Sequence, residues 1–366
     1  MTLRVALVAG PMYDHLYSVF DSAGIDVDIV IHADHPTLNR HVAEMLSAGE
    51  RLDLISTHAK YAPSQSRWLR PLDDLVDASA LRALAPRAVA LGRFADQLWC
   101  VPRNIDVRVL WTRADRVASP PDTWADLEAS EMVFGFPGRE SGLFGTFFEL
   151  VSGSGGELFD ADHRPAMETA EAVHAIEQLV RLGDRAPVDL PSWHYDDVDR
   201  ALLDGRVDAA AAWPGAWGEI SRSAFADQLT PHLYPAGSDR RVSYSGCHGW
   251  AIPKTATDLD AALELLHVLI DHDAQALDAG GGTICAHELA LAAVVPVDDA
   301  DRVRLDITRQ TIAEAMITYP ALAEFPAIED AGWAAIHDAL EHRATPTEAA
   351  ARIQSAAAAV LAEPIA

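Results

Sequence analysis

The beginning of the chain alternates between apolar runs that suit strands and segments that suit helices, and this alternation constrains the fold most. Residues 3–9 form an apolar run, residues 25–31 alternate apolar and polar side chains, and residues 52–57 form a third strand-like run. Helical patterns separate these runs, with residues 38–48 between the second and the third. Strands that alternate with helices in this way predict right-handed βαβ units and a sheet of mostly parallel strands, which is an α/β fold.

The length and composition of the chain predict more than one folded unit. With 366 residues the chain is longer than one ordinary domain, and its 49% hydrophobic and 23% charged residues are typical of a globular protein. Further strand patterns at residues 107–112, 133–136 and 249–254 alternate with helical patterns, and residues 345–361 form a helix with a Thr-Pro-Thr-Glu start. We therefore expect two α/β lobes.

The charge and the cysteines of the chain exclude several kinds of partner. A formal net charge of −27 argues against nucleic acid and against docking on an anionic bilayer, and it favours a neutral or cationic small molecule. Cys100, Cys247 and Cys285 are far apart and form no CxxC pair, so neither a disulfide framework nor a metal site is expected. The three glycines at 280–282 lack the spacing of a phosphate-binding P-loop, and no cofactor is expected.

The first residues of the sequence suit a β-strand rather than an export signal. They lack the long apolar core and the small-residue cleavage site of a secretory signal, and no lipobox cysteine follows them. No apolar run in the chain is long enough to span a bilayer. Two explanations stay open, namely an export signal that is absent from this sequence and retention inside the cell.

A series of short motifs runs through much of the chain in a fixed order. In chain order they are DQLWCVPR at 96–103, WTRAD at 111–115, PDTWADL at 121–127, GSGGELFD at 153–160, LLDGRVDAA at 202–210 followed by WPGAW at 213–217, and GWAIPK at 249–254. Together they resemble the extracellular solute-binding proteins that serve ABC importers. The resemblance is to the carbohydrate-binding branch, which has the type II periplasmic-binding-protein fold and includes maltose-binding protein.

This resemblance implies two lobes, each a mixed and mostly parallel sheet flanked by helices, that are joined by two or three hinge strands around a ligand cleft. We expect residues 1–107 and 253–300 to form the first lobe and residues 108–252 and 301–366 to form the second. Ligand binding would close the hinge, because a ligand shifts a conformational equilibrium only by favouring one state. The resemblance also implies a monomer in the periplasm or at the cell surface, with a membrane permease as its protein partner.

Trp213 and Trp217 flank a Pro-Gly turn and correspond to the cleft aromatics of this family. A flat indole at the mouth of a cleft offers the C–H face of a sugar a surface to stack on. The alternative is that either ring packs in the core of the second lobe.

Arg103, Asn104 and Asp106 follow Pro102, where a plain strand would be apolar. Guanidinium and carboxylate groups form charge-assisted hydrogen bonds with vicinal hydroxyls, so this cluster is a candidate sugar site. The alternative is a salt bridge in the hinge.

The remaining candidates lie in loops that should face the cleft, where binding residues are common. They are Tyr13 and Asp14 after the first strand, His58, Lys60 and Tyr61 after the third, Arg139 and Ser141 at a helix start, Trp193 in an aromatic loop, and His248 and Trp250 at the return strand. For each of them the alternative is a solvated loop residue or a buried side chain whose polar groups are paired within the protein.

Three functions are compatible with these patterns. The leading hypothesis is a binding protein that captures a sugar, sugar alcohol or glycoside without changing it. A second is capture of a polyamine or quaternary amine in an aromatic box, which the acidic surface would assist. A third is a thiaminase-like enzyme, with Cys100 as nucleophile and Asp106 as base.

Overall fold

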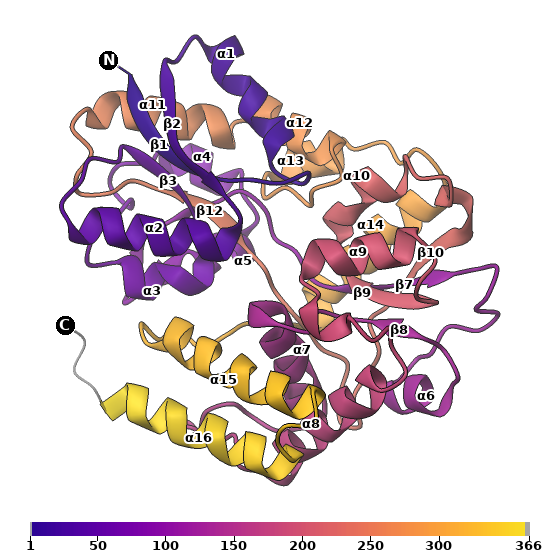
Figure 1. Ribbon diagram of the computed structural model, residues 1–366. Helices are drawn as coiled ribbons and strands as arrows, with labels where there is room; N and C mark the ends of the chain where they lie inside the picture. Colours follow the sequence, from indigo (N-terminus) through magenta and orange to yellow (C-terminus); the bar gives the residue numbers. More distant parts are fainter. Residues whose placement is uncertain (1, 363–366) are drawn as a thin grey trace.

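In the computed structural model, which describes residues 2–362, the chain forms two α/β lobes (Figure 1). The first lobe contains a five-stranded sheet in the order β2-β1-β3-β12-β6. β1 pairs in parallel with β2 and β3, whereas β12 runs antiparallel to β3 and β6. The strands are β1 (Leu3–Val8), β2 (Val27–Ala33), β3 (Leu54–His58), β6 (Val101–Pro102) and β12 (His248–Ala251). The predicted βαβ start of the chain is confirmed, with the second and third strands each beginning two residues later than expected.

Helices cover both faces of this sheet because alternate strand residues point to opposite sides and both sides are apolar. Leucines of α11 pack with Leu3, Val5 and Leu7 on one face, and Leu38, Val42 and Leu46 of α2 pack with Ala6 and Val8 on the other. The first-lobe helices are α1 (Val19–Ala23), α2 (His35–Ser47), α3 (Ala62–Gln65), α4 (Ala78–Arg82), α5 (Pro86–Leu91), α11 (Leu259–Ile270), α12 (His272–Gly280) and α13 (Glu288–Ala292). A short hairpin, β4 (Arg93–Phe94) and β5 (Gln97–Leu98), precedes β6.

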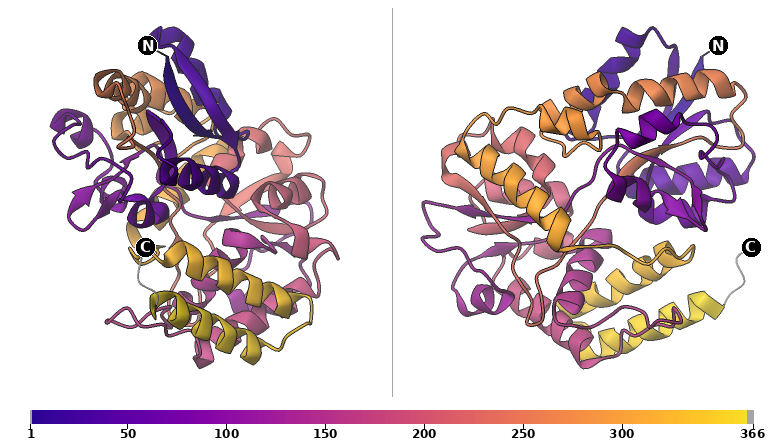
Figure 2. Two further views of the ribbon diagram at one scale, coloured as in Figure 1. Left: turned by 60° about the vertical axis from the view of Figure 1, so that its left-hand side comes forward. Right: turned by 180° about the vertical axis from the view of Figure 1, so that it is seen from behind.

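The second lobe contains a four-stranded sheet in the order β10-β7-β9-β8. Its strands are β7 (Val109–Arg113), β8 (Phe134–Gly135), β9 (Ala209–Ala212) and β10 (Leu229–His232). Its helices are α6 (Trp124–Ala129), α7 (Glu140–Gly153), α8 (Ala170–Gly183), α9 (Tyr195–Leu203), α10 (Trp217–Ile220), α14 (Asp299–Glu314), α15 (Phe325–Leu340) and α16 (Pro346–Ala362). α15 and α16 lie side by side at the edge of this lobe, and α14 packs against β7 and β10 (Figures 1 and 2).

Two extended segments carry the chain between the lobes, and they contact each other on the way. The outgoing segment runs from β6 to β7, and the return segment runs from β11 (Ser243–Tyr244) to β12, with β11 paired to β13 (Met316–Ile317). The backbone N–H groups of Asp106 and Gly246 each donate to the carbonyl of the other, at 2.9 and 3.1 Å. A third connection runs from α13 to α14.

The sequence predicts that the first part of the second lobe ends at residue 252, but the sheet arrangement places this end earlier in the chain. β12 lies in the five-stranded sheet of the first lobe, so the return crossing comes before His248. The motif at 249–254 is a strand of the first lobe rather than the last strand of the second. Lobe boundaries near residues 107, 246 and 300 remain our proposal.

A buried ion pair fastens both crossing segments to the second lobe. The guanidinium of Arg108 donates to Glu149 (3.3 Å), to the hydroxyl of Thr146 (2.6 Å) and to that of Tyr244 (3.3 Å). Glu149 in turn accepts from the backbone N–H of Tyr244 at 2.9 Å. Burial raises the pKa of Glu149 to about 7, against the opposite effect of Arg108. The pair therefore joins the outgoing segment, the return segment and α7 in one polar network.

Replacing Glu149 by alanine is expected to lower the free energy of unfolding by about 3–5 kcal/mol, because the Arg108 guanidinium would stay buried without its carboxylate. Urea unfolding followed by circular dichroism measures this loss. Arg309→Ala, which breaks an exposed pair with Asp306 on α14, is the control and should change the midpoint little. A Glu149→Ala protein as stable as this control would contradict the account.

Candidate functional site

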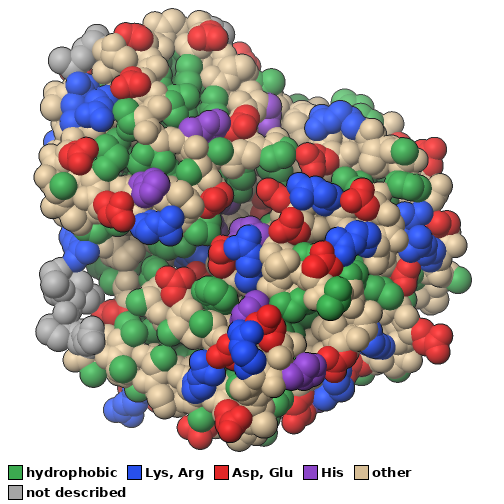
Figure 3. Space-filling view, in the orientation of Figure 1, with side chains coloured by type: hydrophobic (Ala, Val, Ile, Leu, Met, Phe, Trp, Pro, Cys, Tyr) green, Lys and Arg blue, Asp and Glu red, His purple; other side chains and the backbone are tan. Residues whose placement is uncertain are grey.

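A cavity of about 110 Å³ lies between the two lobes, next to the crossing segments. It opens beside the carboxyl ends of β1 and β3, where open α/β sheets commonly bind ligands. The space-filling view shows a narrow hollow where the lobes meet, with histidine and acidic side chains at its rim (Figure 3). Asp34 before α2 and Asp196 in α9 are exposed residues of this lining, one from each lobe.

The structure brings many of the predicted residues together in the lining of this cavity. From the first lobe and the crossing segments come Tyr13, His58, Lys60, Arg103, Asn104, Asp106 and His248, and from the second lobe come Ser141 and Trp213. These residues are up to 235 positions apart in the chain, as Tyr13 and His248 are. Their convergence makes this cavity the candidate ligand site.

Three predicted tryptophans lie in the lobe cores instead. Trp217 is 5% exposed and stacks on Trp111, with ring centroids 6.0 Å apart. The Pro214–Ala216 turn leads into α10, and Trp217, the first residue of this helix, points into the core of the second lobe. Trp193 packs in the second-lobe core below Arg206, and Trp250 packs in the first-lobe core. The alternative given for Trp217, a ring in the core of the second lobe, describes its position, and Trp193 and Trp250 are likewise core side chains.

Three other predicted residues lie near the cavity but outside its lining. Asp14 is exposed and accepts from the backbone N–H of Gly10 at 3.1 Å. Tyr61 is half-buried, with the Lys60 ammonium 5.1 Å from its ring. Arg139 donates to the carbonyl of Ser192 at 2.8 Å and so fixes a loop of the second lobe.

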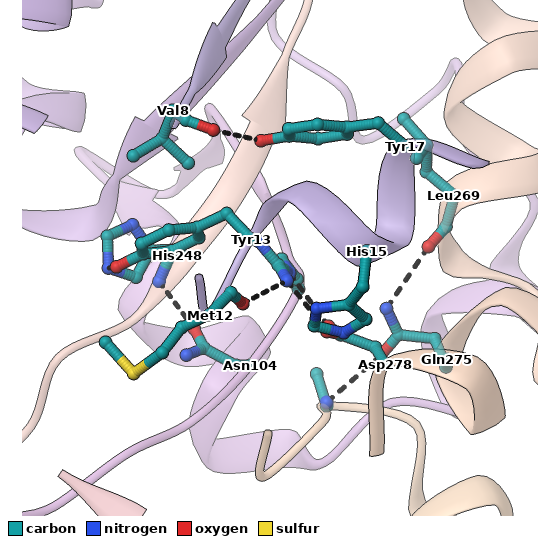
Figure 4. Close-up of polar contacts among 12 residues, drawn as sticks. Val8, Met12, Tyr13, His15, Tyr17, Asn104, His248, Leu269, Gln275 and Asp278 are labelled. Carbon is teal, nitrogen blue, oxygen red and sulfur yellow. Dashed lines mark hydrogen bonds and ion pairs between the residues drawn. The ribbon is translucent and has the colours of Figure 1, made fainter. Parts of the chain in front are cut away.

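Arg103 positions the loop that follows β1. Its guanidinium forms a two-bond ion pair with Asp278 of α12 (2.8 and 2.7 Å) and donates to the carbonyl of Met12 at 2.9 Å. Burial alone would raise the pKa of Asp278, but the opposite effect of the Arg103 guanidinium lowers this pKa to about 2. His15 also contacts Asp278, with its Nε2 atom 2.9 Å from Oδ1 (Figure 4). Arg103 therefore forms a buried ion pair within the first lobe, at the start of the outgoing segment, which agrees with the salt-bridge alternative for this residue.

Three histidines form one wall of the cavity. His248 lies with its ring 4.8 Å from that of His35 and 5.1 Å from that of His58, and the hydroxyl of Tyr13 is 3.0 Å from its Nε2 atom (Figure 4). Burial lowers the pKa of His248 to about 3, and it lowers the pKa of His35 and His58 well below the ordinary range. All three rings are neutral at neutral pH, and a neutral imidazole both donates and accepts hydrogen bonds.

Aromatic side chains of the second lobe and the return segment form the opposite wall. The Trp213 ring is 5.2 Å from that of Tyr244 and 5.9 Å from that of Tyr195. Gly246 leaves room for this wall, since a Cβ atom there would lie 3.2 Å from Cη2 of Trp213. Trp213 is thus the one of the two predicted indoles that faces the cavity.

Asp106 is a buried carboxylate with spare capacity for hydrogen bonds. Its Oδ2 atom accepts from the amide of Asn104 at 2.7 Å, whereas Oδ1 has no partner among the described residues. Burial raises the pKa of Asp106 from 3.8 to about 7, against the lowering effects of Arg304, Asn104 and Arg103. Asn104 also accepts from the backbone N–H of His248 at 2.8 Å, which ties the two crossing segments together (Figure 4).

Several lining residues were not among the predicted site residues, for example His35, His194, Tyr195, Asp196 and Tyr244, although His194 and Tyr195 belong to the aromatic loop for which cleft lining was considered. His35 follows the end of β2, and polar residues after β1 and β3 were recognised by this same signal. His194 and Tyr195 stand beside Trp193 in the predicted aromatic loop, but the start of α9 turns them, and not Trp193, to the cavity. Tyr244 carries no local signal, because the pairing of β11 with β13 places it.

Neither a helix suited to cross a membrane nor a cluster suited to bind a metal is found in the described part of the chain. No helix within residues 2–362 is both long and apolar enough to cross a bilayer. Within the same residues, no group of three or more His, Cys, Asp or Glu side chains is arranged to hold a metal ion.

Residues 27–276 match the model of a family described as bacterial extracellular solute-binding proteins. The chain belongs to this family. Its fold is also that of maltose-bound MalE3 of T. maritima, with a TM-score of 0.87 at 20% identity over 96% of this chain and 98% of the other. Two other similar structures are those of solute-binding proteins of Thermotoga lettingae, bound with α-D-tagatose, and of Agrobacterium radiobacter, in complex with ribitol. Each has a TM-score of 0.86 at 18% identity; the former match covers 98% of this chain and 99% of the other, the latter 98% of both. The predicted type II periplasmic-binding-protein fold is confirmed.

The raised pKa of Asp106 predicts a pH-dependent effect of Asp106→Asn on stability. The folded state binds this proton more tightly than the unfolded state, so the contribution of Asp106 to stability is lost as the pH rises from about 4 to about 7. Asparagine does not ionise, so the Asp106→Asn variant does not lose this stability as the pH rises. The difference in free energy of unfolding between the variant and the parent protein should therefore increase in favour of the variant from about pH 5 to about pH 8.

Urea unfolding of the ligand-free protein at the two pH values measures this difference. Asp28→Asn, at an exposed position of β2, is the control and should show the same difference at both. A constant difference for Asp106→Asn would mean that Asp106 is ionised at both pH values.

Proposed function

We propose that this protein captures a small carbohydrate between its two lobes and delivers it unchanged to an ABC permease. The observation that carries the proposal is the pairing of two walls across one cavity. One wall offers the Trp213 indole with Tyr195 and Tyr244, and the other offers neutral histidines and Asp106. Aromatic faces stack on the C–H faces of sugars, and the polar groups match their hydroxyls.

The comparisons support this choice of ligand class. The similar structures of this fold hold maltose, α-D-tagatose and ribitol, which are a disaccharide, a monosaccharide and a sugar alcohol. The family is described as extracellular, and we propose that the protein acts outside the membrane, where a permease can receive the ligand. Both cavity walls come from one chain, so one copy suffices for binding.

The structure offers no support for the enzyme hypothesis with Cys100 as nucleophile. Cys100 is fully buried in the core of the first lobe and does not line the cavity. Burial raises the pKa of its thiol to about 12, which disfavours the reactive thiolate.

Thermal unfolding in the presence of a library of sugars and sugar alcohols tests the proposal. A ligand at roughly 100 times its dissociation constant stabilises the folded state by about 2.7 kcal/mol, which a rise in melting temperature reports. We expect at least one member of the library to produce such a rise. If none does, while an amine or another class of compound does, carbohydrate capture is the wrong function.

Trp213→Ala is expected to weaken binding of the best library ligand at least tenfold, a loss of about 1.4 kcal/mol, because the stacking surface is gone. Isothermal titration calorimetry measures the dissociation constant. Trp68→Ala is the matched control, since this indole is also half-buried but lies in the first lobe away from the cavity, below Arg67. Equal affinities of the two variants would show that Trp213 does not contribute to ligand binding.

A further inference from the structure

We infer that the ligand is an uncharged polyol no larger than one sugar ring. The inference rests on the proposed function and adds the size and the charge of the ligand. Both follow from how the lobes touch around the cavity and from how its charged groups are already paired.

One end of the cleft is closed by an ion pair between the lobes. The ammonium of Lys60, just after β3, lies 2.7 and 3.0 Å from the two carboxylate oxygens of Glu329 in α15. Their side chains are 7% and 2% exposed. A longer ligand that left the cavity on this side would have to separate two buried charges, which costs several kcal/mol.

The opposite end is closed by backbone contacts. Gly218 of α10 lies so close to the carbonyl of Gly281 that a Cβ atom would come within 2.5 Å of its oxygen. The Arg304 guanidinium of α14 bridges the carbonyls of Pro214 (3.2 Å) and Gly282 (2.8 Å), one in each lobe. In Figure 1, α10 lies next to α12 and α13 to the right of the junction of the lobes, whereas α3 and α15 lie to its left.

The space between these closures is small. The cavity of about 110 Å³ is well below the roughly 300–1,000 Å³ of pockets that enclose drug-sized ligands. A volume of this size favours a single sugar ring or an open-chain sugar alcohol over a chain of several rings. A second ring would need the lobes to stay apart.

The aromatic groups at the cavity already face cations, which disfavours a cationic ligand. The guanidinium carbon of Arg108 lies 4.8, 5.6 and 5.8 Å from the rings of Tyr244, Trp213 and Tyr195. Arg103 lies 5.0 Å from the ring of Tyr13. These guanidinium groups already lie against the rings that an aromatic box for an ammonium ion would need.

The cations are in turn neutralised by carboxylates, which disfavours an anionic ligand. Among the described residues of the lining the cations are Lys60 and Arg103, and they pair with Glu329 and Asp278. The carboxylates that remain in the lining are those of Asp34, Asp106 and Asp196. A uronate or a sugar phosphate would therefore find negative charge and no free cation. The hydroxyl groups of a neutral ligand match the uncharged polar groups of the lining, which are imidazoles, phenols, an amide and hydroxyls.

Isothermal titration calorimetry with chemically matched ligands tests this inference at neutral pH. Each set contains a neutral monosaccharide, its uronate, its 2-amino sugar, and a disaccharide and a trisaccharide of the same unit, for the gluco and the galacto series. Ribitol and xylitol represent open-chain polyols. We expect the tightest ligand to be a neutral monosaccharide or polyol, with every charged or longer relative at least tenfold weaker. Trp213→Ala should lose this ligand and Trp68→Ala should keep it.

The outcomes separate the inference from the proposed function. A disaccharide, a trisaccharide, a uronate or an amino sugar as the tightest ligand overturns the inference and leaves carbohydrate capture intact. If no carbohydrate of any size or charge binds, the proposed function fails and the inference fails with it.

Discussion

The site depends on the contact between the two crossing segments, where Asp106 and Gly246 exchange backbone hydrogen bonds between the lobes. This contact continues the antiparallel pairing of β6 with β12 toward the second lobe, and Arg103, Asn104 and His248 lie together beside it. The Arg108–Glu149 pair fixes the same two segments to α7 on the other side. Side chains that are far apart in the chain therefore meet in one cavity because two short extended segments are anchored at both ends.

Charge pairing determines what kind of molecule such a cavity can hold. Arg103, Arg108, Lys60 and Arg304 are all buried or nearly so, and each faces a carboxylate of its own. Buried charges are tolerated only when they are paired, and pairing within the protein leaves little for a charged ligand. Two of these cations, Lys60 and Arg304, also contact the other lobe, through Glu329 and the carbonyl of Gly282 respectively. The cavity consequently combines a polar lining with cations that are paired within the protein.

The sequence allowed much of the fold and part of the site to be predicted, for identifiable physical reasons. Periodic apolar runs revealed the βαβ start, and ordered motifs indicated two lobes. Polar residues directly after strands, such as Tyr13, His58 and Arg103, were recognised because strand ends converge in α/β sheets. The positions of the tryptophans were harder to predict, because Trp213 faces the cavity whereas Trp217, only four residues later, stacks on Trp111 in the core. Tyr244 was not predicted because its place depends on a strand pairing with residues more than seventy positions away.

The most direct test of the central claim is a crystal structure of the protein with the polyol that stabilises it most. The account predicts one ligand molecule between the Trp213 indole and the imidazole of His248, with the lobes closed and the Lys60–Glu329 contact intact. A ligand bound outside this cavity, or held between lobes that have separated at Lys60 and Glu329, would contradict it.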